Sequence, residues 1–217
     1  MYLRVFGRLV LAASLLIPSV AAAEPHDAVY AVTVSLNWSE ETSAAPPPGA
    51  HWSTLIAFAH SDRYALFSDG DTASSGLALV ATNGRTTVLE AELAEGMRRK
   101  RVGAHIILPG SEGGQATFAF ELPVTPRQNR ISFATMLAPS PDWFSGISGV
   151  LLYEADAWVD QVERPIWVWD AGADSGPDFE GPNLPTQPRQ SVRLLSHPSF
   201  LRASGLRPIG TVVFERR

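Results

Sequence analysis

The chain has 217 residues, enough for one domain with a substantial core, and carries 17 Lys plus Arg against 22 Asp plus Glu. This balance lacks the basic excess of a nucleic-acid binder, and the absence of cysteine excludes disulfides, Fe–S sites, thiol catalysis and a lipid-modified cysteine anchor. With 17 Gly and 17 Pro between many short apolar runs, the composition favours an all-β domain with many turns.

The first 23 residues have the pattern of a secretory signal peptide. Arg4 and Arg8 give a charged start, an apolar stretch follows, and three alanines end at Ala23 as a cleavage site. The apolar stretch is far shorter than the roughly 20 residues of a membrane span, so no transmembrane anchor is expected. We therefore predict an exported protein, periplasmic or secreted, whose mature domain covers residues 24–217. Removal of the two arginines would take the net charge from −5 to −7.

Short strands and two helices are expected along the mature chain. From Tyr30 to Trp38 apolar and polar residues alternate, which is typical of a strand with one buried face. The segments 73–81 and 87–97 have helical character, and Asn83-Gly84 is a stop signal for the first. Further strands are expected at 53–59, 106–108, 116–122, 131–137, 149–153, 161–169, 192–195 and 209–216. Stiff or Gly- and Pro-rich loops are expected at 39–49 and 171–189.

Two acidic segments, 139–146 and 169–176, place carboxylates among Pro, Gly and Ser and therefore read as ordered loops. They carry Asp142 in the first loop and Asp170 and Asp174, four residues apart around Gly172, in the second. Glycine allows a tight turn, so these three carboxylates could converge on a hard cation such as Ca²⁺. The alternative is that each is a turn aspartate that caps its own backbone.

The same segments carry a family resemblance. The motifs that carry it are Ala134-Thr135-Met136-Leu137, then Pro139-Ser140-Pro141-Asp142-Trp143-Phe144, and Trp169-Asp170-Ala171-Gly172-Ala173-Asp174-Ser175-Gly176. Weaker matches, among them Trp38, His197-Pro198 and Val212-Val213-Phe214, occur in the order in which the family has them. From about Ala28 to Arg216 the chain resembles the N-terminal spondin domain family, the F-spondin- and mindin-like adhesive module.

The resemblance implies a fold and a function. The fold is an antiparallel, C2-like β-sandwich with one or two short helices in its connections, and residues 24–217 would form one spondin domain. The family's calcium-binding aspartates correspond to Asp142, Asp170 and Asp174. The threonine usual in the family before the last aspartate is Ala173 here, so one hydroxyl is lost. The implied function is a non-catalytic adhesion or recognition module that binds Ca²⁺ and an unidentified protein or glycan.

Two other functions stay open. Arg98-Arg99-Lys100-Arg101 is either a solvated face or a patch for sulfated or phosphorylated glycans, including lipopolysaccharide in an envelope location. The same aspartates could instead serve a metal-dependent hydrolase. No Gly-x-Ser-x-Gly, His-Glu-x-x-His or phosphate-loop motif is present, so we do not expect an enzyme.

Two histidines and four tryptophans are further candidates for a functional role. For His60 and His197 we expect hydrogen-bonded structural roles rather than ligation. For Trp143, Trp158, Trp167 and Trp169 we expect the core, although an exposed pair could stack on sugars.

Overall fold

The computed structural model describes residues 26–203 and 205–217, so the predicted signal peptide lies outside the described part. The elements, in chain order, are β1 Ala28–Asn37, β2 His51–Trp52, β3 Leu55–His60, α1 Ser75–Asn83, α2 Thr87–Arg98, β4 Val102–Leu108, β5 Ser111–Glu112, β6 Gln115–Val124, β7 Arg130–Ala138, β8 Trp143–Leu151, β9 Tyr153–Glu154, β10 Ala157–Trp158, β11 Gln161–Asp170, β12 Arg193–Leu194, the 3₁₀ helix Pro198–Phe200, β13 Leu201–Arg202, β14 Gly205–Leu206 and β15 Gly210–Arg216.

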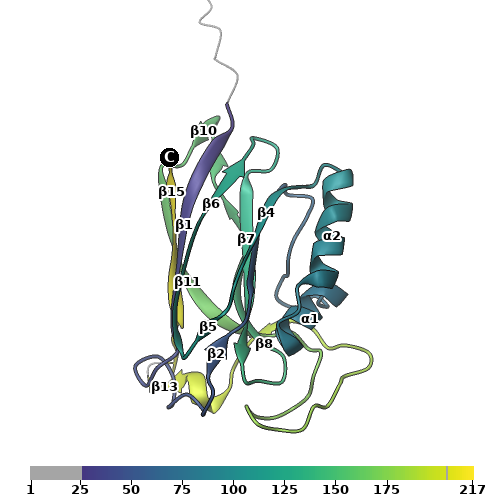
Figure 1. The fold of residues 1–217 in the computed structure, drawn as a ribbon, viewed down its shortest axis with the longest axis vertical. Coiled ribbons are helices and arrows are strands. Elements are labelled where there is room, and N and C mark those ends of the chain that lie inside the picture. The colour runs from purple at the N-terminus through teal and green to yellow at the C-terminus, as the bar shows by residue number, and fades with distance from the viewer. Residues whose placement is uncertain (1–25, 204) are drawn as a thin grey trace, which may run out of the picture.

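The long strands form one antiparallel sheet in the order β4-β3-β7-β8-β11-β15-β1-β6. The sheet curls until β6, at one end of this order, lies against β3 and β4 at the other end (Figure 1). The two halves therefore face each other as the layers of a sandwich that is nearly closed. The predicted all-β, sandwich-like fold with two short helices is confirmed.

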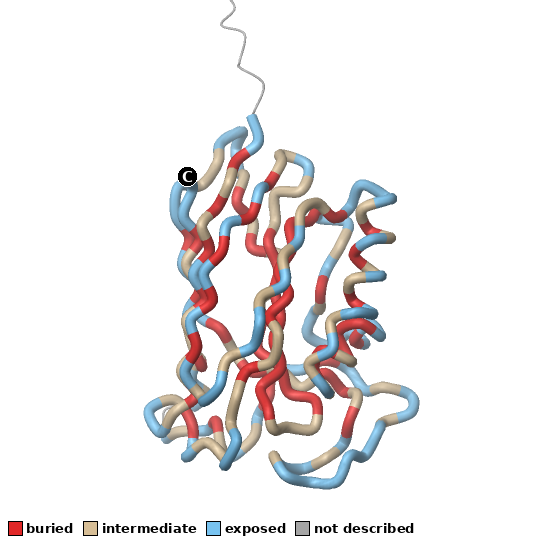
Figure 2. The backbone as a smooth tube through the Cα atoms, in the orientation of Figure 1, coloured by how far each residue is buried: buried red, intermediate tan, exposed pale blue. Residues whose placement is uncertain are grey.

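The sandwich interior is filled by side chains that alternate along the strands. In β6 every second residue is buried, including Phe118, Phe120 and Leu122, as the period of two predicts. Val32 and Val34 of β1 lie opposite Phe120 and Phe118 in register and are fully buried. In Figure 2 buried and exposed stretches alternate along the strands at the left, and burial is more continuous along the central strands.

A second apolar layer joins the helices to the outer side of β3. Every residue of β3 is buried, because Leu55, Ala57 and Ala59 belong to the interior cluster while Ile56 and Phe58 pack with the helices. Strands covered on both faces read as continuous apolar runs, which is the pattern of this segment.

The predicted stop signal ends the first helix at the expected place, and a serine caps its start. Ser74 caps α1 by accepting a hydrogen bond from Leu77 N at 3.1 Å, and Gly84 ends the helix with a left-handed backbone, φ 68°. The helix α2 covers the predicted segment and buries Leu89 and Leu93. Both predicted helices are confirmed.

Two boundaries differ from the prediction and matter for the site. The strand β8 begins at Trp143, so only residues 139–142 of the first acidic segment form a turn. The aspartate at position 170 is the last residue of β11 rather than part of a loop. Both strands extend further because Trp143 and Asp170 pair in register across β8 and β11.

Candidate functional site

Asp142 lies at the turn between β7 and β8 and is fully buried. Its Oδ2 accepts hydrogen bonds from the backbone N–H groups of Ala173, at 2.6 Å, and Asp174, at 3.0 Å. Its Oδ1 is also buried and has no hydrogen-bond partner among the described residues. One carboxylate thus joins two segments about thirty residues apart in sequence and keeps one oxygen free.

Asp170 lies beside Asp142 at the ends of the paired strands. Ala171 N donates to Asp142 O at 3.2 Å, which continues the β8–β11 pairing past Asp170. The Asp170 carboxylate accepts from Gly172 N through Oδ1, at 2.7 Å, and forms an ion pair with Arg193, Nε to Oδ2 at 3.4 Å. Only 16% of the Asp170 side chain is exposed, so its carboxylate is poorly solvated.

Asp174 is buried in the long loop that crosses the lower end of the molecule in Figure 1. Its Oδ1 accepts from Gly176 N at 2.7 Å, and Oδ2 accepts from Leu184 N at 3.0 Å. Next to this contact, the backbone N–H of Ser175 donates to the carbonyl oxygen of Leu184 at 2.9 Å. Asp174 therefore holds the two arms of the predicted long loop together, and an isolated antiparallel bridge between Asp174 and Pro185 joins the same two arms.

Gly172 makes the turn between the two aspartates possible. Its φ is +68°, and an added Cβ would lie 2.4 Å from the carbonyl oxygen of Gln190. The carbonyl oxygen of Gly172 accepts from Gln190 N at 2.7 Å. The tight turn predicted from this glycine is confirmed, and no larger residue fits without a backbone shift.

The three aspartates, which we call the acidic site, form an electrostatically unfavourable group. Burial is the main reason that the pKa of Asp142 is raised to about 6, and the charge of Asp170 is the next cause. The hydrogen bonds from Ala173 and Asp174 N–H lower it, and the charge of Asp174 raises it further. A cation next to Oδ1 would remove both the burial penalty and the repulsion.

All three carboxylates nevertheless make the backbone hydrogen bonds of turn aspartates. Among residues 26–203 and 205–217, no three His, Cys, Asp or Glu side chains are arranged as a set that could hold a metal ion. Calcium takes 6–8 oxygen ligands, and carbonyl groups and water regularly supply part of this number. The residues fit a cation at one point, the unpartnered Oδ1 of Asp142, and the remaining ligands would include backbone and water oxygens.

Thr186 is a neighbour of the acidic site that sequence reasoning did not single out. Its backbone N–H donates to Ala173 O at 2.9 Å, and its Oγ1 is buried without a partner among the described residues. It lies in the returning arm of the loop, so only the pairing of the two arms brings it next to position 173. It places a hydroxyl-bearing residue beside Ala173, the position where the resemblance led us to expect a threonine.

The histidines have the structural roles expected of them. His60 is buried, with Nε2 2.7 Å from Ser132 Oγ and Nδ1 2.8 Å from Ser61 O, and burial lowers its pKa. His197 begins the 3₁₀ helix by accepting from Ser199 N through Nδ1 at 3.3 Å.

The tryptophan prediction is confirmed in full for Trp143 only, while Trp158 and Trp169 pack against the two apolar clusters from their edges and Trp167 belongs to neither cluster. Trp143 is buried, but Trp158, Trp167 and Trp169 are only half-buried. Trp167 and Trp169 lie with Phe67 along a mostly apolar surface hollow of about 380 Å³. They occupy alternate positions of β11, so they share the outward face of that strand while Ile166 and Val168 fill the interior.

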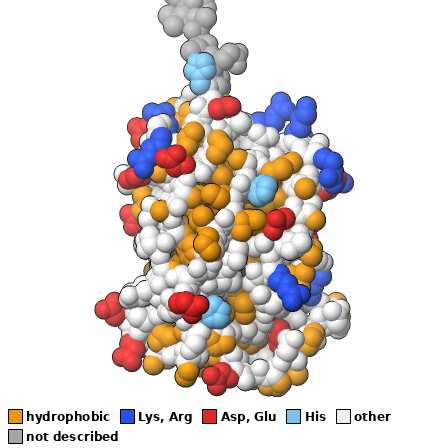
Figure 3. Space-filling view, viewed as in Figure 1, with side chains coloured by type: hydrophobic (Ala, Val, Ile, Leu, Met, Phe, Trp, Pro, Cys, Tyr) orange, Lys and Arg blue, Asp and Glu red, His pale blue; other side chains and the backbone are white. Residues whose placement is uncertain are grey.

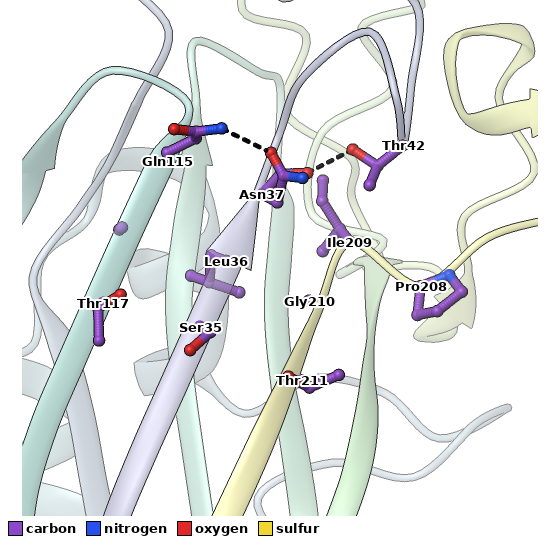
Figure 4. A pocket seen from close by; sticks show the side chains of 11 residues that line it. Ser35, Leu36, Asn37, Thr42, Gln115, Thr117, Pro208, Ile209, Gly210 and Thr211 are labelled. Atoms are coloured by element: carbon purple, nitrogen blue, oxygen red, sulfur yellow. Dashed lines mark hydrogen bonds between the residues drawn. The ribbon is translucent and has the colours of Figure 1, made fainter.

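Another hollow, of about 440 Å³, lies on the outer side of β1, β6 and β15 (Figure 4). Its lining side chains are uncharged, and Asn37 connects two of them through hydrogen bonds with Gln115 and Thr42. It offers neither titratable groups for catalysis nor carboxylates for a metal. Among the described residues no helix is long and apolar enough to span a bilayer.

Comparison with known proteins agrees with this architecture. The Spondin_N family model matches residues 28–202, which takes in all three aspartates. Spondin-2 of Rattus norvegicus is 35% identical over 91% of this chain and 64% of its own length, and Spondin-2 of Homo sapiens is 33% identical over 87% and 61%.

Spondin-1 of Gallus gallus is 35% identical over 87% of this chain but only 25% of its own length. The chain thus spans less than two thirds of the curated relatives that it matches. Each comparison nevertheless covers at least 87% of this chain. The chain belongs to the Spondin_N family.

Proposed function

We propose that the protein is an exported, non-catalytic recognition module whose acidic site binds Ca²⁺. The observation that supports the cation is the buried Oδ1 of Asp142, which has no partner beside two further carboxylates. A bound cation would neutralise this group and fix the β7–β8 turn against the loop after β11. Those two segments are far apart in sequence, so the cation would act as a crosslink in a domain without cysteine.

The proposal that the protein is an adhesion or recognition module comes from its family, and only the domain that it shares with the relatives supports it. The spondin relatives extend beyond the region that they share with this chain, so what those further parts bind is not carried over. A rigid sandwich that presents a cation-ordered loop is suited to binding a protein or glycan, because preorganised loops lose little entropy on binding. Secretion would follow from the predicted signal at Met1–Ala23.

A non-catalytic role is supported by how the carboxylates are used. Each of the three aspartates accepts at least one backbone hydrogen bond, and Asp142 and Asp174 are buried. Hydrolysis would need a metal-bound water and a carboxylate free to accept its proton. Carboxylates that order turns are better suited to hold an ion than to exchange protons with a substrate.

Thermal melts test the cation. With Ca²⁺ at about a hundredfold excess over its dissociation constant, the melting temperature of the mature chain should rise by about 5–10 °C relative to metal-stripped protein. In Asp170→Asn the response should shrink, because one charge is lost while the amide oxygen can still accept from Gly172 N. The metal-free variant should melt no lower than metal-free wild type, since repulsion on Asp142 is reduced.

Asp160→Asn is the matched control. It also removes an aspartate from an ion pair, here with Arg216 at 2.7 Å, but Asp160 is exposed and lies outside the acidic site. Its calcium response should equal that of wild type. An identical melt of wild type with and without Ca²⁺ would show that the aspartates only order turns.

A further inference from the structure

A basic pocket lies where α2 leads into β4. Its lining consists of Ser61, Asp62, Arg63, Arg99, Lys100, Arg101 and Arg127, and its volume is about 520 Å³. Figure 3 shows basic side chains gathered at the upper right of the molecule, the end at which α2 turns into β4 in Figure 1. The basic run of the sequence supplies three of the five cations, and two come from elsewhere in the chain.

The pocket is built from three segments that hydrogen bonds hold together. Ser61 N donates to Arg101 O at 2.8 Å, which fixes the segment after β3 against the turn after α2. Gln128 Nε2 donates to Lys100 O at 3.0 Å, and this fixes the β6–β7 turn against the same residues. The cations are thus presented from a preorganised backbone, although their side chains are exposed.

Most of the cations in the pocket lack a counter-charge. Arg99 forms an ion pair with Glu95, Nε to Oε1 at 2.6 Å. Among the described residues Arg63, Lys100, Arg101 and Arg127 have no carboxylate oxygen within 4 Å of their side-chain nitrogens. Asp62 is the single acid in the lining. The pocket is therefore strongly positive in a chain whose net charge is −5.

Lys100 occupies a backbone position that does not suit lysine. Its φ is +57°, and it closes α2 by donating from its N–H to Met97 O at 2.9 Å, while Arg101 N donates to Gly96 O at 2.9 Å. Helices that end in this way usually have glycine at the left-handed position, because a side chain there is strained. Stability of the helix end therefore does not explain this lysine, whereas a charge facing the pocket does.

We propose that the basic pocket binds the sulfate or phosphate ester groups of a soluble acidic glycan. Guanidinium groups bind such oxyanions through paired hydrogen bonds, and several converging on one hollow can hold more than one ester group. The lining contains no aromatic side chain on which bases could stack and no apolar rim that could enter a membrane. A highly charged sugar suits this chemistry better than a nucleic acid or a lipid surface.

The pocket is independent of the acidic site. Arg130 begins β7 beside the pocket residue Arg127, and Asp142 follows the other end of this nine-residue strand. A strand of this length spans roughly 30 Å, several times the Debye length of about 8 Å at physiological ionic strength. Binding to the pocket and binding of Ca²⁺ can therefore be tested separately, and failure of one leaves the other standing.

Calorimetric titration of the mature protein tests the ligand class. A heparin tetrasaccharide and a phosphorylated mannose oligosaccharide are the two probes, each with its ester-free counterpart as control. Binding of either probe that is lost without its ester groups and weakens as salt is raised supports the proposal, and the tighter probe identifies the ester. Absence of binding by both, or equal binding of the ester-free sugars, would overturn it.

Variants then locate the site. Lys100→Gly and Arg127→Gln should each weaken binding by about fivefold, the scale of one well-placed surface charge pair. Arg98→Gln is the control, because Arg98 belongs to the basic run but pairs with Glu95 and does not line the pocket. It should change affinity by less than about twofold, given screening by salt. The melting temperature of Lys100→Gly should not fall, since glycine relieves the strained backbone.

If Arg98→Gln weakened binding as much as Lys100→Gly did, the ligand would follow the charge of the run and the pocket proposal would be wrong. If only the pocket variants lost affinity, the convergence of three segments would be the basis of binding. Retention of full affinity in both pocket variants would contradict the proposal in the same way.

Discussion

Asp142 contributes both to the fold and to the proposed cation site. One carboxylate oxygen is used by the fold, because it accepts from Ala173 and Asp174 N–H and so attaches the loop after β11. The other oxygen is buried without a partner, a state that costs free energy in a native protein. The sequence predicted the three aspartates because they stand among Gly and Pro. It did not predict that one oxygen of Asp142 would accept two backbone hydrogen bonds while the other stays unpartnered, because this depends on tertiary contacts.

The raised pKa of Asp142 predicts how stability depends on pH. Its pKa of about 6 in the folded state lies above the value near 3.9 expected in the unfolded chain. Between these values the folded protein binds more protons. In metal-stripped protein the free energy of unfolding should therefore fall as pH rises through this window, by up to about 3 kcal/mol from this group.

Urea unfolding at pH 4.5 and 7.5 measures this dependence, with Asp142→Asn as the comparison. The amide keeps an oxygen for Ala173 and Asp174 N–H but cannot ionise, so the part of the slope due to this group should vanish. Saturating Ca²⁺ should also reduce the fall in wild type, because a cation favours the ionised carboxylate. A slope that Asp142→Asn leaves unchanged would contradict the assignment of the raised pKa.

At the scale of elements, the layer formed by α1 and α2 depends on one polar connection as well as on apolar packing. Ser74 Oγ donates to Glu92 Oε2 at 2.7 Å, and Gly76 N donates to Glu92 Oε1 at 2.8 Å. A side chain on Gly76 would lie 2.5 Å from Leu89 Cα, so the two helices cross in close contact. The start of α1 is therefore fixed to the middle of α2.

We expect Ser74→Ala to lower the free energy of unfolding by about 1–2 kcal/mol, because it removes both the cap of α1 and the hydrogen bond to Glu92. Ser68→Ala is the control, since this exposed side chain makes no hydrogen bond among the described residues, and its effect should stay within about 0.5 kcal/mol. Chemical denaturation of the three proteins measures the difference. Equal stability of Ser74→Ala and wild type would show that apolar packing alone places the helix.

Strands with clear alternation could be predicted from the sequence, as the buried residues of β1 and β6 show. The start of β8 could not, because Trp143 follows a turn-rich segment and becomes part of a strand only by pairing with Asp170. The outward placement of Trp167 and Trp169 was missed for a related reason. Their alternation with Ile166 and Val168 marks two faces, but large aromatic side chains on either face suggest burial.

At the scale of the whole molecule, the sandwich separates two ends of opposite charge. The acidic site lies beyond the last residue of β7, and the basic pocket lies beside its first residue. Neither site is a continuous stretch of sequence: Asp142 meets a loop about thirty residues away, and Arg63 and Arg127 join a run of basic residues from other segments. The residue pattern and the family resemblance both led to the first site, whereas only the folded chain shows the second as a pocket.

Direct calcium titration of metal-free mature protein by calorimetry at pH 7.5 tests the cation site most directly. Wild type should bind one Ca²⁺ per chain and prefer it to Mg²⁺, which demands a stricter octahedral geometry than a site completed by carbonyl and water oxygens offers. Asp142→Asn should lose this binding while its far-ultraviolet spectrum stays that of a β-protein. Wild type without any calcium heat, or Asp142→Asn with the same affinity as wild type, would contradict a cation held by the acidic site.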